Sequence, residues 1–476
     1  MTTKLFYRIA IASVGLYAMA CSVPAGMQKD VTIKTPAAFA GTNDTTSNSV
    51  IKWRDFFKDE YLAVLIDSAL KNNQELHIAL QEINIAQNDI RLRKSAYLPF
   101  IGVGAGAGVD KSGLYTSKGA SDATNQVMPG KAFPDPLPDY ALGVNLTWEV
   151  DIWKKLRNYK GAAVNRYLAT VEGRNYMVTR LIAEIASSYY ELLALDSQLE
   201  TLRRNIAIQQ NALEIVKLEK TSARVTELAV KKFEAEVLKN QSKQFELLQL
   251  ITLTENRINF LVGRFPQPVQ RSAVDFLTKQ PDTLSAGVPS QLLKNRPDIR
   301  QMEQRVTAAR LDVKAVKAEF YPSLTIRSGI GYNAFNPKYL VTTPQSLIYQ
   351  LAGDLMAPLI NRNAIKAEYY SANARQVQAV YEYEQTLLFA CTEVGNQLNG
   401  IANLKKNFEL KEKQVQALNE SIEISTILFR SARADYMEVL MTQRDALDAR
   451  FELIDTRKQQ FQAMINLYRA LGGGWR

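Results

Sequence analysis

The chain contains little histidine, cysteine, proline or glycine for its length. Its 476 residues include one histidine, His77, two cysteines, Cys21 and Cys391, 23 glycines and 16 prolines. A single histidine leaves little basis for His-based metal or acid–base chemistry, and two cysteines exclude a disulfide framework. Because the glycines and prolines are few and clustered, we expect long uninterrupted elements.

The sequence also lacks long apolar stretches and runs of basic residues. After the N-terminal segment, no stretch reads as a transmembrane helix, so any membrane crossing must be made by strands. The formal charge is +10, with both signs spread along the chain, which gives nucleic-acid binding little support. No paired-carboxylate, Ser/His/Asp or metal-ligand cluster has convincing spacing. We therefore expect neither enzymatic activity nor a cofactor.

The N-terminal segment 1–20 is typical of a signal peptide. Lys4 and Arg8 form a basic start, an apolar stretch follows, and small residues precede Cys21. This end resembles a bacterial lipobox, in which the cysteine thiol is acylated and becomes the new N-terminus. We predict lipidation of Cys21 at the start of an N-terminal extension, 21–60. The alternative is ordinary cleavage that leaves Cys21 a free thiol. By resemblance to sorted lipoproteins, Ser22 after the cysteine, in place of Asp, favours the outer membrane.

The rest of the chain repeats itself. Lys94–Pro99 recurs as Lys317–Pro322, and Ser222–Arg224 recurs as Ser431–Arg433. The number of residues between the two copies differs for these two motifs, because the first copy carries a longer Gly/Pro-rich loop within 112–139. We predict a first repeat over 61–264, a linker and equatorial segment over 265–290, and a second repeat over 291–476.

Each repeat contains two segments with strand-like alternation. In 142–152, apolar residues such as Val144, Leu146 and Trp148 alternate with polar residues such as Asn145 and Glu149. One face of such a strand suits lipid and the other suits water. We predict strands at about 100–112, 140–152, 322–334 and 346–359. A half-buried sheet in a soluble protein is the alternative.

Each repeat also contains very long helices, predicted over 155–262 and 362–471. Leu192, Leu195 and Leu199 step by three and four residues, which lays a seam along one helix face. At 1.5 Å per residue, sixty helical residues extend about 90 Å, so these helices must pack along their length. Ile208 and Ile215 lie off the seam, as expected for a wall with neighbours on two sides.

Four strands cannot close a barrel, and an open edge in lipid leaves backbone groups unpaired. Several chains must therefore pool their strands. We prefer a trimer with twelve strands, although strand counting alone also allows a dimer.

Several motifs in this order resemble the TolC family of outer-membrane efflux proteins, specifically its lipidated, OprM-type branch. These are the Pro99 and Pro322 junctions, Trp148–Trp153, Asn295–Ile299 and Leu467–Trp475. The resemblance implies a mainly α fold with duplicated long-helix hairpins and four membrane strands per protomer. It also implies a homotrimer that joins an outer-membrane β-barrel to a periplasmic helical tunnel. Its partners would be a periplasmic adaptor, an inner-membrane pump and outer-membrane lipid.

The narrow periplasmic end of the tunnel holds the candidate site. Asp435–Met441 resembles the family's gate segment, in which acidic side chains ring the closed entrance. Glu438 matches one acidic position, and Met441 stands where the family often has Asp. Asp435 either adds charge or caps the helix start. For both acids the alternative is a solvated helix face.

The tips of the helical hairpins are the second candidate. Arg224, Arg430 and Arg433 are candidate adaptor contacts, with solvated surface arginines as the alternative. Ala223 and Ala432 stand where the family often has glycine, which predicts looser or displaced turns.

We therefore predict a passive outer-membrane duct of a tripartite efflux system, of the type driven by a proton-coupled pump of the RND class, that exports small toxic solutes. A duct for type I polypeptide secretion and a coiled-coil scaffold lipoprotein without a pore are the alternatives.

Overall fold

The computed structural model describes residues 23–32, 35–39, 51–128, 130–272, 276–281, 287–358, 362–431 and 433–475. Cys21, Leu359 and Ala432 lie outside these ranges. The chain divides into two units. The first unit comprises residues 1–30, 84–168 and 304–381, and the second comprises 31–83, 169–303 and 382–476.

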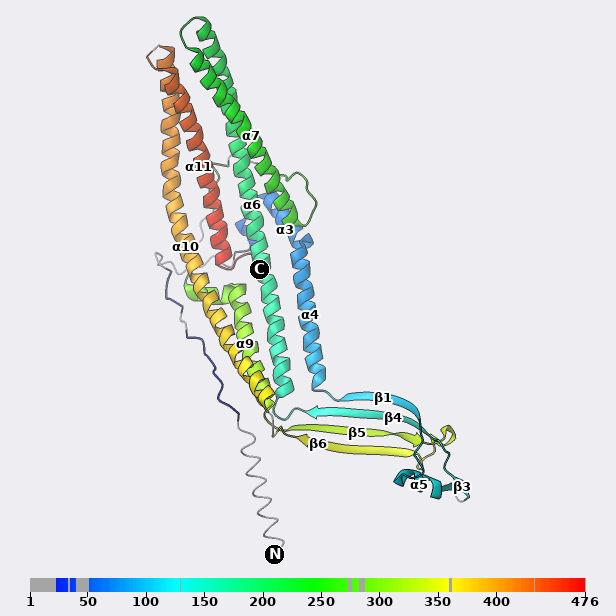
Figure 1. The fold of residues 1–476 in the computed structure, drawn as a ribbon. Helices are drawn as coiled ribbons and strands as arrows, with labels where there is room; N and C mark the ends of the chain where they lie inside the picture. The colour runs from blue at the N-terminus through cyan, green and yellow to red at the C-terminus, as the bar shows by residue number, and fades with distance from the viewer. Residues whose placement is uncertain are drawn as a thin grey trace. The chain divides into compact units, whose positions relative to one another are not determined.

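The first unit contains a four-stranded antiparallel sheet in the order β1-β4-β5-β6 (Figure 1). Its strands are β1 (Phe100–Asp110), β4 (Leu137–Val150), β5 (Ser323–Ala334) and β6 (Leu347–Met356). Between β1 and β4 lie α5 (Ser117–Thr124), β2 (Gln126–Met128) and β3 (Lys131–Ala132), and η2 (Pro337–Tyr339) follows β5. The central pairing, β4 with β5, joins the two repeats.

Strand β4 (137–150) is displaced toward the N-terminus relative to the predicted range 140–152, because the Asp151 side chain is bonded to the start of the following helix. The Asp151 carboxylate accepts hydrogen bonds from the backbone N–H groups of Leu156 (3.0 Å) and Arg157 (2.9 Å). These contacts satisfy donors at the start of α6 (Lys155–Thr221) and end the strand at Val150.

The helices of the first unit pack around a small aromatic core. They are most of α9 (Pro297–Ala318) and of α4 (Gln74–Ala96), together with the starts of α6 and of α10 (Asn363–Arg430). Phe320 and Tyr369 meet edge to face at 5.6 Å between ring centroids. Val313 and Val316 of α9 complete the buried cluster.

The second unit is built from two long helical hairpins, α6–α7 and α10–α11 (Figure 1). Helix α7 spans Glu227–Val262 and α11 spans Tyr436–Ala470. The shorter elements of the unit are α2 (Trp53–Phe56), α3 (Glu60–Asn72), η1 (Pro289–Gln291) and α8 (Leu292–Asn295).

The predicted seams form the core of this unit. Leu192, Leu199 and Leu202 of α6 are buried together with residues of α3, α7 and α11. The off-seam residues Ile208 and Ile215 are exposed, at 55% and 48%. Helix α6 therefore has one apolar side inside the unit and apolar residues on its outside.

Candidate functional site

The sheet of the first unit has two chemically different faces. In the strand register, Asn145 lies opposite Gly102 and Gly329, and Thr147 lies opposite Arg327. Polar residues and glycines therefore share one face. The other face carries apolar side chains from all four strands: Ile101, Val103, Leu142, Val144, Leu146, Trp148, Leu324, Ile326, Ile330, Leu347, Tyr349, Leu351 and Leu355. Such alternation is typical of strands between lipid and water.

Charges on the polar face pair with one another. Arg327 Nε lies 3.5 Å from Asp354 Oδ2 on the neighbouring strand. Asn333 Nδ2 donates to Asp139 Oδ1 at 2.7 Å. These contacts keep charged groups on the face that suits water.

A row of glycines hollows the polar face. Gly104, Gly143 and Gly331 lie side by side on β1, β4 and β5. A Cβ atom on Gly331 would lie only 2.4 Å from the Leu142 carbonyl oxygen. The hollow over these strands has a volume of about 400 Å³. The polar face therefore keeps free space where side chains would otherwise stand.

The tip of the first hairpin turns at the position matched between the repeats. Arg224 N–H donates to the carbonyl oxygen of Glu219 (3.0 Å), and Ala223 N–H donates to that of Lys220 (2.9 Å). The side chain of Thr226 caps the start of α7. Lys220 and Glu227 form an ion pair across the turn.

The expectation of a looser or displaced first turn is wrong. Ala223 adopts a left-handed conformation with φ of 57°. It takes the backbone shape that glycine favours, and the helix-ending hydrogen bonds hold it there. The turn therefore keeps its place and its tightness at some cost in backbone strain.

The second tip repeats this pattern as far as the structure describes it. Arg433 N–H donates to the carbonyl oxygen of Leu428 at 2.8 Å, as Arg224 does to Glu219 in the first tip. Asp435 precedes α11 in an extended conformation, but its side chain makes no capping hydrogen bond. Side-chain capping by Asp435, one of the two interpretations of this residue, is therefore absent.

Asp435 and Glu438 are both exposed. Within the described ranges, neither side chain forms an ion pair or a hydrogen bond. Their carboxylates are therefore uncompensated by any described residue of the same protomer. This arrangement is compatible with a pore-facing position and equally with a solvated helix face.

The exposed face of α11 carries further acids that the sequence analysis did not single out. Asp445 and Asp448 follow Glu438 and Met441 at steps of three and four residues, and all four are exposed. Asp445 lies 3.4 Å from Arg444, whereas Asp448 has no ion pair in the described part of the chain. The spacing from Glu438 alone would have revealed this acidic face.

The three candidate arginines of the tips are exposed. Arg224 and Arg433 lie in the two turns, and Arg430 is the last residue of α10. In the described part of the chain their guanidinium groups form no ion pair. They are available to another molecule, but nothing in one protomer assigns a partner.

An apolar cluster joins the two hairpins near their tips. Leu440 and Tyr436 of α11 pack against Val230 and Phe233 of α7 and against Leu213 of α6. The start of α11 therefore contacts the first hairpin through apolar side chains, while its acids face away from this cluster.

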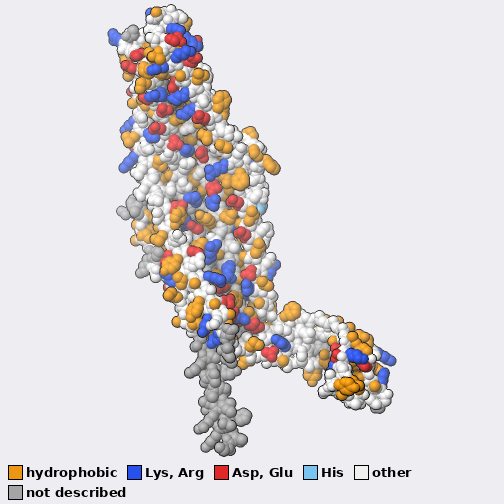
Figure 2. All heavy atoms as spheres, in the orientation of Figure 1, with side chains coloured by type: hydrophobic (Ala, Val, Ile, Leu, Met, Phe, Trp, Pro, Cys, Tyr) orange, Lys and Arg blue, Asp and Glu red, His pale blue; other side chains and the backbone are white. Residues whose placement is uncertain are grey.

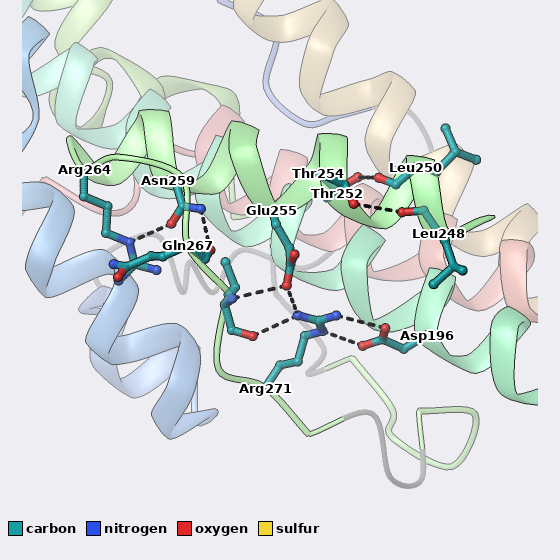
Figure 3. A network of polar contacts seen from close by, with 11 residues as sticks. Asp196, Leu248, Leu250, Thr252, Thr254, Glu255, Asn259, Arg264, Gln267 and Arg271 are labelled. Atoms are coloured by element: carbon teal, nitrogen blue, oxygen red, sulfur yellow. Dashed lines mark hydrogen bonds and ion pairs between the residues drawn. The ribbon is translucent and has the colours of Figure 1, made fainter. Parts of the chain in front are cut away.

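The linker between the repeats is tied to the first hairpin by Arg271 (Figure 3). Its guanidinium donates to both carboxylate oxygens of Asp196 on α6 and to Glu255 on α7. Burial opposes the charged form, but these hydrogen bonds outweigh it and raise the pKa of Arg271. One arginine thus fixes the linker to both helices of the hairpin.

A second arginine holds the same linker to the other hairpin. Arg457 of α11 donates to the carbonyl oxygen of Leu277 at 2.8 Å and lies 3.7 Å over the ring of Phe408. Burial lowers the pKa of Arg457. Sequence reasoning missed both arginines because each contact joins residues far apart in the chain.

The described part of the N-terminal extension begins at Val23, two residues after Cys21. Val23 packs against the first unit's cluster around Phe320 and Tyr369. Lys29 N–H donates to Gln376 Oε1 (3.1 Å), and Gln376 Nε2 donates back to the Lys29 carbonyl (2.7 Å). The extension is therefore bound to α10 close to the strands.

The described ranges contain neither a metal-ligand cluster nor a membrane-spanning helix. No group of three or more His, Cys, Asp or Glu side chains there is arranged to hold a metal ion. No described helix is long and apolar enough to span a membrane. Cys391 is partly buried in a helical seam, and burial raises the pKa of its thiol.

Comparison with known proteins gives relatives along nearly the whole chain. The pyoverdine export outer membrane protein OpmQ of Pseudomonas aeruginosa is 26% identical over 474 residues, covering 98% of this chain and 97% of the relative. The cation efflux system protein CusC of Escherichia coli is 27% identical over 427 residues, covering 89% and 88%.

Solved structures show the same fold. A crystal structure of CusC matches with a TM-score of 0.82 at 23% identity and covers 94% of this chain and 100% of its own. The open state of the Neisseria gonorrhoeae MtrE outer membrane channel matches with a TM-score of 0.82 at 22% identity, covering 96% and 98%. The predicted fold class, mainly α with long helical hairpins and membrane strands, is confirmed.

The family model described as outer membrane efflux protein matches residues 65–264 and 288–473, one region for each repeat. The resemblance to TolC-type outer-membrane channels is therefore confirmed, and with it the assignment to an efflux system. The chain belongs to the outer membrane efflux protein family.

Proposed function

We propose that three copies of this chain close into one channel that conducts small solutes passively from the periplasm to the outside. The channel would work with a periplasmic adaptor and an inner-membrane pump of the RND class. It would carry no enzymatic activity and need no cofactor besides the covalent lipid on Cys21.

The open sheet carries this proposal. In the described part of the chain, β1 and β6 each pair with one neighbour only. Their free edges would leave backbone groups unpaired in lipid, at several kcal/mol each. Pairing β6 of one copy with β1 of the next removes both edges, and three copies give twelve strands.

The outer helices of the second unit support the same closure. On α7, Leu238, Phe245 and Phe260 are exposed at 59%, 70% and 73%. On α10, Leu410 and Ile424 are exposed at 67% and 58%. Leu238 and Phe245 are seven residues apart, and Leu410 and Ile424 are fourteen apart, as expected of seams that pack against neighbouring helices.

The bound N-terminal extension supports lipidation. An extended chain advances by at most about 3.6 Å per residue, so two residues keep Cys21 within about 7 Å of Val23. Val23 packs beside Phe320, three residues before β5. Acyl chains on Cys21 would therefore reach the leaflet that borders the strands.

We place the gate at the second tip, with Asp435 and Glu438 facing the channel axis. Three copies would bring like charges together, which repel one another and attract cations. Arg224, Arg430 and Arg433 would remain on the outside of the tips for contact with the adaptor. Small solutes are the favoured cargo, because the two relatives are named for pyoverdine export and cation efflux.

Electrophoresis without boiling, followed by conductance in planar bilayers, tests the channel. We expect a heat-sensitive trimer and discrete ion conductance. A monomer without conductance would instead favour the coiled-coil scaffold. Crosslinking in cells, with purification of the attached proteins, tests the partners: an ABC exporter in place of an RND pump would favour polypeptide secretion.

The same crosslinking tests the tips and the anchor. Photocrosslinkers at positions 224 and 433 should capture the adaptor, whereas one at the exposed position 409 on α10 should not. Cys21→Ala should abolish incorporation of labelled palmitate, and labelling that persists in this variant would place the lipid elsewhere.

A further inference from the structure

The chain's positive charge is concentrated in the helical segments beside the strands. Together, residues 84–99, 151–168, 304–322 and 362–381 contain fifteen lysines and arginines and five aspartates and glutamates. Their net charge of +10 equals that of the whole chain. All four segments belong to the first unit.

This concentration of positive charge is not obvious from the sequence, because acidic and basic residues are mixed along the whole chain. Without Lys4 and Arg8 of the signal peptide, the formal charge is +8, so the rest of the mature chain is slightly acidic at −2. Figure 2 shows basic and acidic side chains interspersed along the helical hairpins and also close to the strands. By count, the four helical segments beside the strands therefore carry the chain's excess of positive charge.

Each of the four strand–helix junctions carries one exposed lysine. Lys94 and Lys317 lie in the last turns of α4 and α9, Lys154 directly precedes α6, and Lys366 lies at the start of α10. All four are exposed. In the described part of the chain none of them forms an ion pair with a carboxylate. We call these residues the junction lysines.

Interactions with the helix dipoles explain the positions of only two of the four junction lysines. A cation near the C-terminal end of a helix interacts favourably with the helix dipole, which accounts for Lys94 and Lys317. Lys154 and Lys366 stand at N-terminal ends, where the dipole disfavours a cation. Lys154 also has φ of 61°, a conformation that favours glycine over lysine. Among the residues that the structure describes, neither the helix dipole nor an ion pair therefore stabilises these two lysines.

The junctions also carry aromatic residues suited to a membrane interface. Trp153 stacks on Tyr321 at 4.9 Å between ring centroids, and its indole N–H donates to the carbonyl oxygen of Pro322 at 2.8 Å. Tryptophan and tyrosine favour the level of lipid headgroups. The apolar sheet face ends at these junctions, so the lysines lie where a hydrocarbon layer gives way to headgroups.

We propose that the junction lysines bind the phosphate groups of anionic phospholipids in the periplasmic leaflet of the outer membrane. The inference rests on the proposed function, because it requires the strands to span that membrane. A lysine near an anionic membrane surface contributes about 1 kcal/mol, which corresponds to about a fivefold change in binding.

Lipid retention by the purified full-length protein tests this proposal. The protein is exchanged into mixed micelles with equal amounts of phosphatidylglycerol and phosphatidylethanolamine, and retained lipids are counted by native mass spectrometry. The test variant combines Lys94→Gln, Lys154→Gln, Lys317→Gln and Lys366→Gln. The matched control makes the same change at Lys232, Lys405, Lys406 and Lys413, four exposed lysines of the hairpins.

We expect the wild type and the control to retain phosphatidylglycerol in preference to phosphatidylethanolamine. In the test variant, the ratio of retained phosphatidylglycerol to phosphatidylethanolamine should fall at least tenfold. Raising the salt concentration should reduce the wild-type preference, because salt screens exposed charges. Equal preference in the test variant and the wild type would overturn the proposal. So would equal displacement of phosphatidylglycerol by inorganic phosphate, which would indicate a free-anion surface.

Conductance of the same preparations separates this proposal from the proposed function. A channel that conducts but shows no preference for anionic lipid contradicts only the lipid inference. A preparation that binds phosphatidylglycerol through the junction lysines but never conducts supports the lipid inference and contradicts the channel.

Discussion

The carbonyl oxygen of Asn295 lies 2.5 Å from the position that a Cβ atom on Gly472 would occupy. Gly472 has φ of 84° and ends the last helix of the second repeat. The end of the chain is thus docked against the start of the same repeat. Arg296 strengthens the contact, because its Nη1 donates to the carbonyl oxygen of Ala470 at 2.8 Å.

The first repeat closes in the same way. A Cβ atom on Gly263 would lie 2.3 Å from the carbonyl oxygen of Asn72. The neighbouring Asn73 donates to the carbonyl oxygen of Leu261 at 2.8 Å. Asn73 therefore does in the first copy what Arg296 does in the second, and the duplication preserves a contact as well as a pattern.

Gly472→Ala should destabilise the protein by at least about 2 kcal/mol. A left-handed conformation costs a non-glycine residue about 1–2 kcal/mol, and the clash with Asn295 adds to this. The melting temperature of the detergent-solubilised protein should fall. Gly400→Ala is the control, because a Cβ atom there meets nothing within 4 Å. Alanine in this helix should stabilise by about 0.5–1 kcal/mol, and equal effects of the two changes would contradict the docking.

Ala223→Gly should stabilise the first tip by about 1 kcal/mol. The change relieves the strain of the left-handed alanine, although glycine gives back part of the gain through the entropy of the unfolded chain. Hydrogen exchange of the amides of residues 219–226 should slow. Ala235→Gly, at an exposed position within α7, should have the opposite sign. Faster exchange in Ala223→Gly would contradict the strained turn.

The stability of the first unit should depend on the ionisation of Glu319. Burial raises the pKa of this carboxyl above its ordinary 4.5, and the negative charge of Glu368 raises it further. The folded state therefore holds the proton more tightly than the unfolded state. The resulting stabilisation is complete below pH 4.5 and is lost as the pH rises through the folded-state pKa.

Glu319→Gln removes this dependence and keeps an acceptor for the Tyr159 hydroxyl, which donates to Glu319 at 3.1 Å. The melting temperature of the variant minus that of the wild type should therefore increase between about pH 4 and pH 7. The exposed Glu409→Gln should show no such trend. A difference that stays constant with pH would rule out an ionisation effect at Glu319.

Periodic features were predictable from the sequence, and single long-range contacts were not. The seam through Leu192 and Leu199 and the alternation around Val144 follow from local spacing, and both faces are formed as expected. The end of β4 differs because Asp151 caps the next helix. Only the three-dimensional contact decides between strand and cap for such a residue.

The candidate site shows the same division. The positions of the two turns followed from the repeat, but the left-handed Ala223 did not, because side-chain propensity disfavours that conformation in alanine. Arg271 and Arg457 tie the linker to both hairpins through contacts that no local pattern encodes. Whether Glu438 faces the channel axis depends on the other copies of the chain. The sequence and the structure of one protomer place this residue on an exposed helix face.

Glu438→Ala should make the channel less sensitive to divalent cations. If three Glu438 carboxylates surround the axis, a cation bound among them obstructs conduction, and each nearby charge contributes about 1 kcal/mol in water. Loss of the ring should raise the half-blocking concentration of a divalent cation at least fivefold in single-channel recordings. Met441→Asp should lower it, because Met441 is exposed on the same face of α11 and the change adds a carboxylate there.

Glu409→Ala controls for the loss of one exposed carboxylate far from the tip and should leave the blocking concentration unchanged. If Glu438→Ala conducts as the wild type does at every divalent concentration, Glu438 lies on a solvated face and the gate must be sought elsewhere. Asp445 and Asp448, the next exposed acids along α11, would then be the next positions to change, since they continue the same face away from the tip.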